Sequence, residues 1–187
     1  MIELADIRAA AERLAPVVVR TPLISSPVLD ELTGGRVLLK AENLQRTGSF
    51  KIRGAYNMLS QLTPEQAEKG AVAFSSGNHA QAVAAAGTML GIKTTIVMPE
   101  DTPRIKIDNT RHLGGETVLY DRYKEDREAI AQGIAAETGA TLVPPYNHEH
   151  IVTGQGTAGL ELMEQCEEMG LVPDQVLINC SGGGLTA

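Results

Sequence analysis

The chain has 187 residues, of which 43% are hydrophobic and 21% charged, and its formal net charge is −7. This length suits one well-packed domain or two small ones. The negative charge, the absence of Trp and the scarcity of Phe and Tyr argue against nucleic acid and anionic membrane surfaces as partners. No apolar run approaches the roughly 20 residues that a membrane-spanning helix needs.

Cysteine usage and the N-terminus indicate the compartment. Cys166 and Cys180 lack the spacing of a metal site, so we expect free thiols in a reducing environment and no bound metal. Glu3 and Asp6 lie within a helical pattern, which is unlike a signal peptide. The sequence therefore predicts a soluble, cytoplasmic protein.

Apolar periodicity, proline and glycine predict strands that alternate with helices. Helices are expected at residues 3–14, 29–34, 49–61, 63–70, from the turn at 76–81 to Gly91, and at 103–113, 125–138 and 153–169. Strands are expected at 37–41, 71–75, 94–98, 116–120, 141–143 and 175–179, with a short β-prone run at 17–19. This spacing predicts an α/β protein whose parallel sheet is flanked by helices.

The stretch Thr47–Ala55 follows the expected strand at 37–41. Ser49 is a good N-cap for the helix that follows. Lys51 would lie in the first turn, where the helix dipole disfavours a cation. The dipole and any neighbouring buried surface both favour the neutral, nucleophilic amine. On position alone, however, a solvated surface lysine is the better explanation of Lys51.

Two further turns lie between an expected strand and an expected helix. At Ser181–Gly184, consecutive glycines let backbone amides converge on an anion, although a flexible turn or an altered dinucleotide-binding loop is also compatible. The turn at Ser75–Gln81 suits a carboxylate at a helix N-terminus. His79 in this turn could be a general base, but a structural hydrogen-bonding role is commoner for a polar residue on a capped turn.

Residues 42–45 and 47–55 resemble the lysine motif of fold-type II pyridoxal-phosphate enzymes, closest to the threonine dehydratase and serine racemase branch. The stretches at 75–81, 154–157 and 181–185 resemble further family segments in the same order. The resemblance implies the tryptophan synthase β-like fold, with twisted parallel sheets and flanking helices. A smaller domain of residues 70–148 would be inserted into a larger one built from 1–69 and 149–187, which is incomplete at its C-terminal end.

The resemblance also implies the site and its cofactor, pyridoxal 5′-phosphate. Lys51 would carry the cofactor as a Schiff base, and Ser76 would be a second catalytic residue on the opposite side of the substrate. The implied cofactor contacts are Phe50, Lys51, Asn78, Ser181, Gly182, Gly183, Gly184 and Leu185. The implied substrate contacts are Ser75, Ser76, Gly77, Asn78 and His79. Asn147 and Arg127 match positions near the substrate, and Arg127 could pair with an acidic substrate tail or be a solvated helix arginine.

The implied reaction is elimination of water from L-threonine or L-serine, giving 2-oxobutanoate or pyruvate and ammonia. The alternatives are a serine racemase, a hydroxyaspartate dehydratase or an inactive fragment that acts as a binding module. A nucleotide-binding α/β protein would require the lysine motif to be coincidental. The family implies a homo-oligomer, a dimer or a tetramer, that acts on a small hydroxy amino acid. Because family members are much longer, we expect residues 1–187 alone to bind the cofactor poorly and to turn over little.

Overall fold

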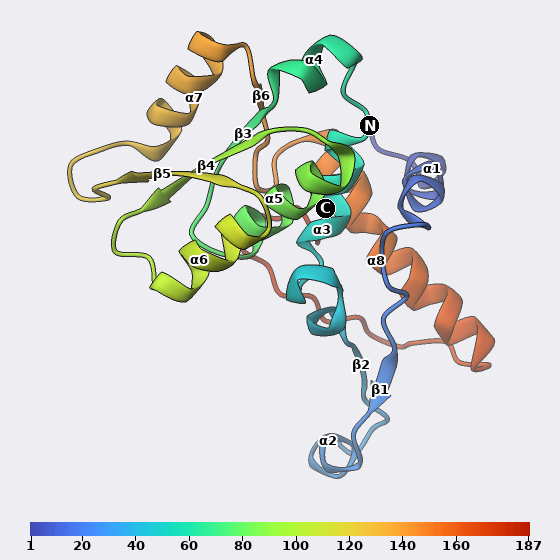
Figure 1. The fold of residues 1–187 in the computed structure, drawn as a ribbon. Helices are drawn as coiled ribbons and strands as arrows, with labels where there is room; N and C mark the ends of the chain where they lie inside the picture. Colours follow the sequence, from blue (N-terminus) through green and yellow to red (C-terminus); the bar gives the residue numbers. More distant parts are fainter.

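A four-stranded sheet forms the centre of the structure, a computed structural model that describes residues 1–187 (Figure 1). Its strands lie in the order β5 (Glu116–Tyr120), β4 (Thr94–Pro99), β3 (Ala71–Phe74) and β6 (Thr141–Leu142). Every neighbouring pair is parallel, which confirms the α/β prediction. β3 is buried along its whole length, as expected of a parallel strand that is covered on both faces.

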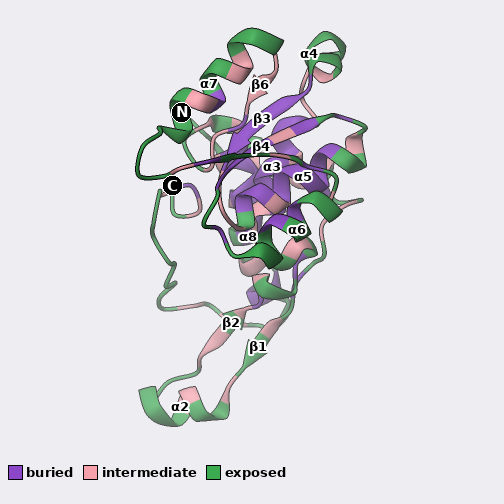
Figure 2. Ribbon diagram, turned by 60° about the vertical axis from the view of Figure 1, so that its left-hand side comes forward, coloured by how far each residue is buried: buried purple, intermediate pink, exposed green.

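Helices cover the two faces of this sheet. The helices are α5 (Asn78–Leu90), α6 (Arg104–His112) and α7 (Arg127–Thr138). Side chains alternate between the faces along β3, so Ala73 packs in the apolar cluster that contains α5, whereas Val72 packs in the cluster that contains Ala131 of α7. Figure 2 shows the buried residues concentrated in β3, β4 and the helices α3 and α5.

A second group of helices packs beside α5, and it comprises α1 (Leu4–Leu14), α3 (Lys51–Leu59) and α8 (Glu149–Glu168). The backbones of α3 and α8 cross closely. A Cβ at Gly154 would lie 2.6 Å from the Arg53 carbonyl oxygen, and one at Gly54 would lie 2.9 Å from the Ile151 carbonyl oxygen. The two glycines therefore permit a crossing that larger residues would block. One apolar cluster joins α3, α5 and α8, so the division at residues 70 and 148 stays a prediction.

The part of the chain that lies between α1 and α3 in the sequence forms an arm that projects from this body (Figures 1 and 2). It contains β1 (Leu23–Ser25), α2 (Pro27–Thr33) and β2 (Leu38–Lys40), and the two strands pair antiparallel. The short helices η1 (Glu42–Leu44) and η2 (Arg46–Gly48) lead from the arm into α3. After α3, α4 (Pro64–Lys69) begins with the predicted capping box of Thr63 and Gln66, which the structure confirms. None of the helices combines the length and the apolar character that crossing a lipid bilayer requires.

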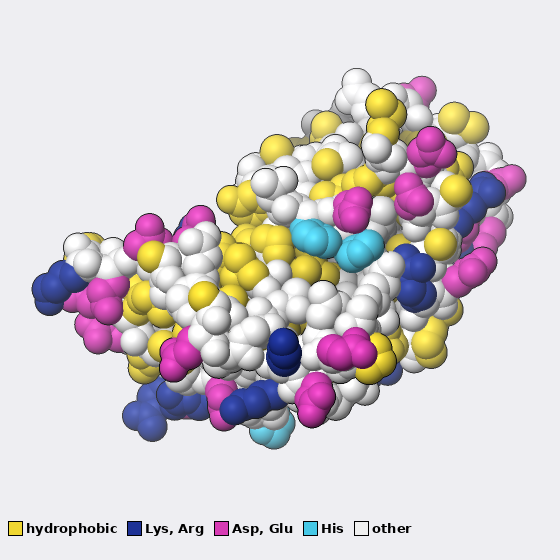
Figure 3. All heavy atoms as spheres, turned by 90° about the horizontal axis from the view of Figure 1, so that it is seen from above, with side chains coloured by type: hydrophobic (Ala, Val, Ile, Leu, Met, Phe, Trp, Pro, Cys, Tyr) yellow, Lys and Arg dark blue, Asp and Glu magenta, His cyan; other side chains and the backbone are white.

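The beginnings of two helices differ from the predictions. Ser49 does not cap α3: it is extended, with φ −165° and ψ 162°, and α3 begins two residues later at Lys51 after Phe50. The strained turn at Thr47, with φ +64°, redirects the chain before the helix starts. The helix expected from residue 153 begins earlier, at Glu149, because the His148 side chain caps it by accepting a hydrogen bond from the His150 amide. The two rings lie 5.1 Å apart. Figure 3 shows histidine side chains side by side on one face of the molecule.

Three expected elements are absent. Residues 17–19 follow α1 as a turn, and Val18 donates its amide to Leu14 instead of to a strand. Residues 175–179 form no strand because no other segment of the chain pairs with their backbone, and Leu177 is 90% exposed. Residues 181–186 form turns and not the start of a helix. A strand needs a partner along its edge, and apolar sequence alone does not supply one.

Candidate active site

Lys51 lies at the first position of α3, half-buried against a loop from another part of the chain. Its Nζ donates a 2.7 Å hydrogen bond to the Pro145 carbonyl oxygen and lies 5.2 Å from the centre of the Phe50 ring. Burial lowers the pKa of the Lys51 amine below its usual value. A larger fraction of the amine is therefore neutral and nucleophilic than in a solvated lysine.

The loop whose carbonyl accepts the hydrogen bond from Lys51 contacts three of the predicted motifs, and we call its residues 143–146 the bridging segment. The Val143 amide donates a 2.8 Å bond to Val72 of β3, and its carbonyl accepts a 3.0 Å bond from Nε2 of His79. Pro145 accepts from Lys51, and Tyr146 packs against the glycines at 182 and 184. In the sequence, Pro144 and Pro145 were used only to end the expected strand at 141–143. Because proline fixes the backbone φ angle, the two adjacent prolines could also have indicated a rigid loop.

The glycine loop, residues 181–184, borders a cavity of about 200 Å³. Tyr146, Asn147, Val152, Gly182, Gly183, Gly184 and Ala187 line this cavity, and none of their side chains is acidic. Gly183 has φ +85°, which an L side chain rarely adopts. A Cβ at Gly184 would lie 2.9 Å from Cβ of Tyr146, and a Cβ at Gly182 would overlap the Tyr146 ring. Ser181 is exposed and Leu185 is half-buried at the ends of the loop.

The turn from Ser75 to Asn78 places polar groups at the N-terminus of α5. Gly77 is the N-cap of α5, and no side chain caps the first amides of the helix. Those amides suit a carboxylate, because the helix dipole also favours negative charge there. Asn78 is exposed, and Ser75 and Ser76 are half-buried and line a second, larger cavity of about 610 Å³.

The side chain of His79 lies beneath this turn and does not face either cavity. It is 3% exposed, and it donates from Nε2 to the Val143 carbonyl. Burial lowers the pKa of His79 to about 4; the bond to Val143 opposes this shift and the charge of Lys51 adds to it. The neutral ring therefore has the structural role that the sequence favoured, and only its backbone amide is available for the predicted substrate contact.

Replacing His79 by Gln should make the stability of the fold less sensitive to acid. The folded-state pKa of about 4 lies below the ordinary value of 6.5, so the unfolded chain binds a proton first as the pH falls. Stability is then intact above pH 6.5 and is lost towards pH 4, by about 3 kcal/mol in total. Urea unfolding of the wild type and of His79→Gln between pH 4 and pH 6.5 measures how steeply the free energy of unfolding changes with pH. The exposed His112, replaced by Gln, is the control, and equal slopes for His79→Gln and the wild type would refute the assignment.

One of the basic residues that line the larger cavity, Arg127, has no ion-pair partner. Arg127 lies with its Cζ 5.4 Å from the centre of the Phe74 ring and lines this cavity together with Ser75 and Ser76. Two other cations of the lining are paired: Arg122 with Asp101 at 2.6 Å, and Lys124 with Asp121 at 2.7 Å. The guanidinium of Arg127 makes no ion pair in the structure and remains able to bind an anion.

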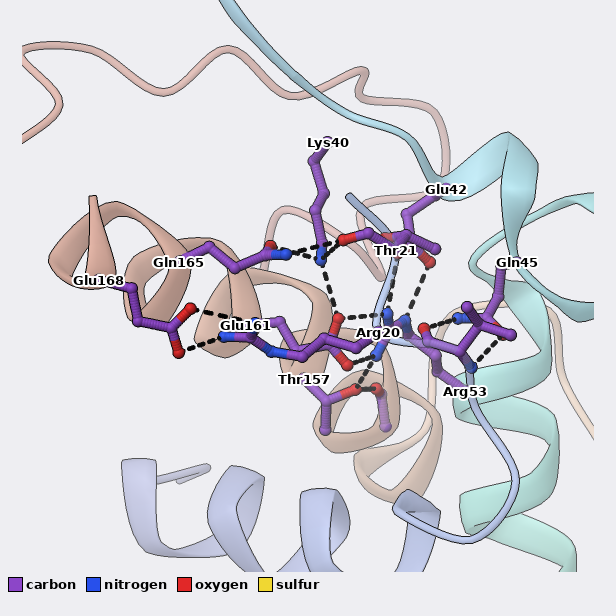
Figure 4. A network of polar contacts seen from close by, with 12 residues as sticks. Arg20, Thr21, Lys40, Glu42, Gln45, Arg53, Thr157, Glu161, Gln165 and Glu168 are labelled. Atoms are coloured by element: carbon purple, nitrogen blue, oxygen red, sulfur yellow. Dashed lines mark hydrogen bonds and ion pairs between the residues drawn. The ribbon is translucent and has the colours of Figure 1, made fainter. Parts of the chain in front are cut away.

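A buried ionic network fixes the helix that carries Lys51 (Figure 4). Arg53 is fully buried and forms paired hydrogen bonds of 2.8–2.9 Å with both Glu42 and Glu161. Lys40 donates to Glu161, to Gln165 and to the Thr21 carbonyl, each at 2.8 Å. Burial alone would raise the pKa of Glu161, but hydrogen bonds from Arg53 and Lys40 outweigh it and lower the pKa. This network was not predicted from the sequence, because its members lie up to 144 residues apart.

Comparison with known proteins gives a family and close relatives. A family model described as "Pyridoxal-phosphate dependent enzyme" matches residues 14–187. An L-threo-3-hydroxyaspartate ammonia-lyase of Pseudomonas sp is 48% identical over 180 residues, which are 96% of this chain and 55% of the relative. An L-threonine ammonia-lyase of Thermotoga maritima is 48% identical over 185 residues, which are 99% of this chain and 45% of the relative.

Solved structures give the same result. Maize serine racemase superposes with a TM-score of 0.92 at 42% identity, and the match covers 98% of this chain and 55% of that one. A threonine deaminase from T.th. superposes with a TM-score of 0.90 at 48% identity, over 98% of this chain and 58% of that one. The chain thus spans about half the length of the curated relatives that it matches.

Proposed function

This chain belongs to the pyridoxal-phosphate dependent enzyme family, and from that premise we propose that its protein eliminates water from L-threonine, and from L-serine, to release ammonia. The products would be 2-oxobutanoate and pyruvate. One observation carries the proposal: the half-buried Lys51 amine, with its lowered pKa, is joined by the bridging segment to the glycine loop and to the turn at α5. The fold is that of fold-type II pyridoxal-phosphate enzymes, and the cofactor of the family is pyridoxal 5′-phosphate.

The residues present fit this cofactor. The glycine loop offers backbone amides beside a cavity without acidic side chains, and a Cβ at Gly182 or Gly184 would collide with Tyr146. Such a loop suits the phosphate group. Lys51 would hold the aldehyde carbon, and Phe50 and Asn78 would contact the ring. The unpartnered Ser49 hydroxyl, buried two residues before Lys51, is a further polar group that a ligand could satisfy.

Each group of residues has a defined task in the proposed reaction. The bound cofactor supplies an electron sink for the electrons of the substrate Cα–H bond. The amides at Ser75–Asn78 hold the substrate α-carboxylate and orient Cα. The amine of Lys51 accepts the Cα proton at Nζ, which its lowered pKa permits because more of it is neutral. Ser76 lies in the α5 turn, from which it would face the other side of Cα.

The test uses the protein with its whole natural chain, purified with pyridoxal phosphate. We expect borohydride reduction to fix the cofactor on Lys51, as found by mass spectrometry of peptides, and we expect threonine to give 2-oxobutanoate. Absence of an adduct, or an adduct on another lysine, would refute the proposal. An adduct on Lys51 together with D-serine as the main product from L-serine would replace the dehydratase by a racemase.

A second candidate substrate is threo-3-hydroxyaspartate, and Arg127 favours it. Its unpaired guanidinium shares a cavity with Ser75 and Ser76, so a substrate held there by its α-carboxylate could present a second carboxylate to Arg127. A charge-assisted hydrogen bond of this kind is worth about 1.5–3 kcal/mol.

Replacing Arg127 by Gln should therefore discriminate between the substrates. We expect kcat/KM for threo-3-hydroxyaspartate to fall about 10- to 100-fold, while that for threonine changes little. Steady-state kinetics with both substrates measures this change. The control is Arg104→Gln, which removes an exposed arginine of α6 from outside the cavity. Equal losses for both substrates would show that Arg127 supports the fold and does not recognise a second carboxylate.

A further inference from the structure

We infer that Tyr146 is a positioning residue, whose ring sets the place of the glycine loop relative to Lys51. The inference rests on the proposed function, because it assigns the loop to the phosphate of the cofactor. It adds a residue that none of the sequence motifs contains. Three features carry it: the contact of the ring with the loop, the rigid link to Lys51, and the part of the tyrosine that makes the contact.

The ring of Tyr146 lies directly against the backbone of the glycine loop. A Cβ at Gly182 would overlap the ring at Cγ, Cδ1 and Cε1, so the ring occupies the place where a side chain would stand. At Gly184 the nearest atoms to such a Cβ are Cβ, Cα and the carbonyl oxygen of Tyr146, at 2.9–3.0 Å. Gly183, between them, has nothing within 4 Å on that side. The loop is therefore supported at two points by one residue.

The same residue is joined rigidly to Lys51. Tyr146 directly follows Pro145, whose carbonyl holds the Lys51 amine at 2.7 Å. Two consecutive prolines fix the backbone φ angles that precede Tyr146. On its other side, the Tyr146 carbonyl accepts a 3.2 Å bond from His148, the residue that caps α8. A shift of the ring would therefore change the distance between the phosphate site and the amine.

The contact with Gly182 is made by ring carbons and not by the phenol hydroxyl. The hydroxyl of Tyr146 forms no hydrogen bond in the structure, and the residue is 40% exposed. Phenylalanine should consequently replace tyrosine with little loss, whereas alanine should remove the support at Gly182 and leave only the contact of Cβ and the backbone with Gly184. The small side chain of alanine would also make room for a Cβ at position 182.

The test is a double-mutant cycle in the protein with its whole natural chain. The dissociation constant of pyridoxal phosphate, measured by fluorescence titration, is the main readout, and pyridoxal without phosphate is a second probe. We expect Tyr146→Ala and Gly182→Ala each to weaken pyridoxal phosphate binding about 10-fold or more. We expect Tyr146→Phe to stay within about twofold of the wild type. In the double variant Tyr146→Ala/Gly182→Ala, the loss of affinity should be smaller than the product of the two single losses. Once the ring is removed, the Cβ of residue 182 no longer has a ring to overlap, so the second substitution costs less.

Each outcome has a distinct meaning. If the wild type binds no pyridoxal phosphate, the proposed function itself fails. If the wild type binds but the two losses multiply, or if Tyr146→Phe loses as much as Tyr146→Ala, the positioning role of the ring is refuted. An equal loss of binding for pyridoxal would also refute it, because a role through the loop acts on the phosphate. Tyr146→Phe and the Gly182→Ala comparison keep the inference testable even where Tyr146→Ala folds poorly.

Discussion

Replacing Lys51 by Ala is expected to abolish covalent attachment of the cofactor and to remove nearly all turnover. The variant loses the amine that would hold pyridoxal phosphate and also the base for the Cα proton. Loss of a positioned acid or base alone costs about 10²- to 10⁴-fold in rate. The measurements are the absorbance spectrum before and after borohydride, and 2-oxobutanoate formation from threonine.

A matched control and a rescue make this result specific. Lys106 is exposed on α6, so Lys106→Ala should keep both the adduct and the activity. A small alkylamine added to Lys51→Ala should restore part of the rate, because a free amine can accept the proton in place of Nζ. Retention of more than a tenth of the wild-type activity by Lys51→Ala would contradict the assigned role.

Replacing Arg53 by Met is expected to lower the free energy of unfolding by about 3–5 kcal/mol, because it leaves two partly buried carboxylates without the buried cation that pairs them. Arg53 is fully buried, and Glu42 and Glu161 both bind it. In the variant Lys40 alone would remain beside Glu161. Urea unfolding measures the loss, and the control Arg104→Met removes the cation of an exposed pair on α6, which should change stability little.

The same network predicts a pH dependence. The pKa of Glu161 is lowered in the folded state, so its contribution is present above the ordinary glutamate pKa of about 4.3 and is lost as the pH falls below it. Arg53→Met should weaken this acid dependence, because it removes the hydrogen bonds that lower the Glu161 pKa. If Arg53→Met were as stable as the wild type at neutral pH, the network would not hold α3 in place.

Local patterns in the sequence were sufficient for most of the helices and for the parallel sheet. The capping box at Thr63 and the buried strand Ala71–Phe74 depend on residues that are close together in the sequence, so local patterns are sufficient to predict them. The absence of a strand at 175–179 and the extended conformation of Ser49 depend on partners and turns elsewhere in the chain.

The same distinction applies to the site. Lys51 and the two loops were predicted as site residues from contiguous motifs, whereas the bridging segment and Arg53 act through distant contacts. The bond from Lys51 to Pro145 spans 94 residues, and that from Arg53 to Glu161 spans 108. The two prolines of the bridging segment indicate a rigid loop but not which residues it contacts, and no local pattern marks Arg53 as the centre of a buried ionic network. Long-range contacts of this kind become visible only when the chain is folded.

The close crossing of α3 and α8 at Gly54 and Gly154 limits how the site can open and close. At this crossing the two backbones are in contact, so no side chains lie between them there that could repack as one helix slides past the other. Shear motion between them is therefore blocked, and Lys51 moves with α8 as one body. Any opening of the site is therefore expected in other connecting segments, such as the turn at residues 75–77, while Lys51 and the bridging segment stay in place.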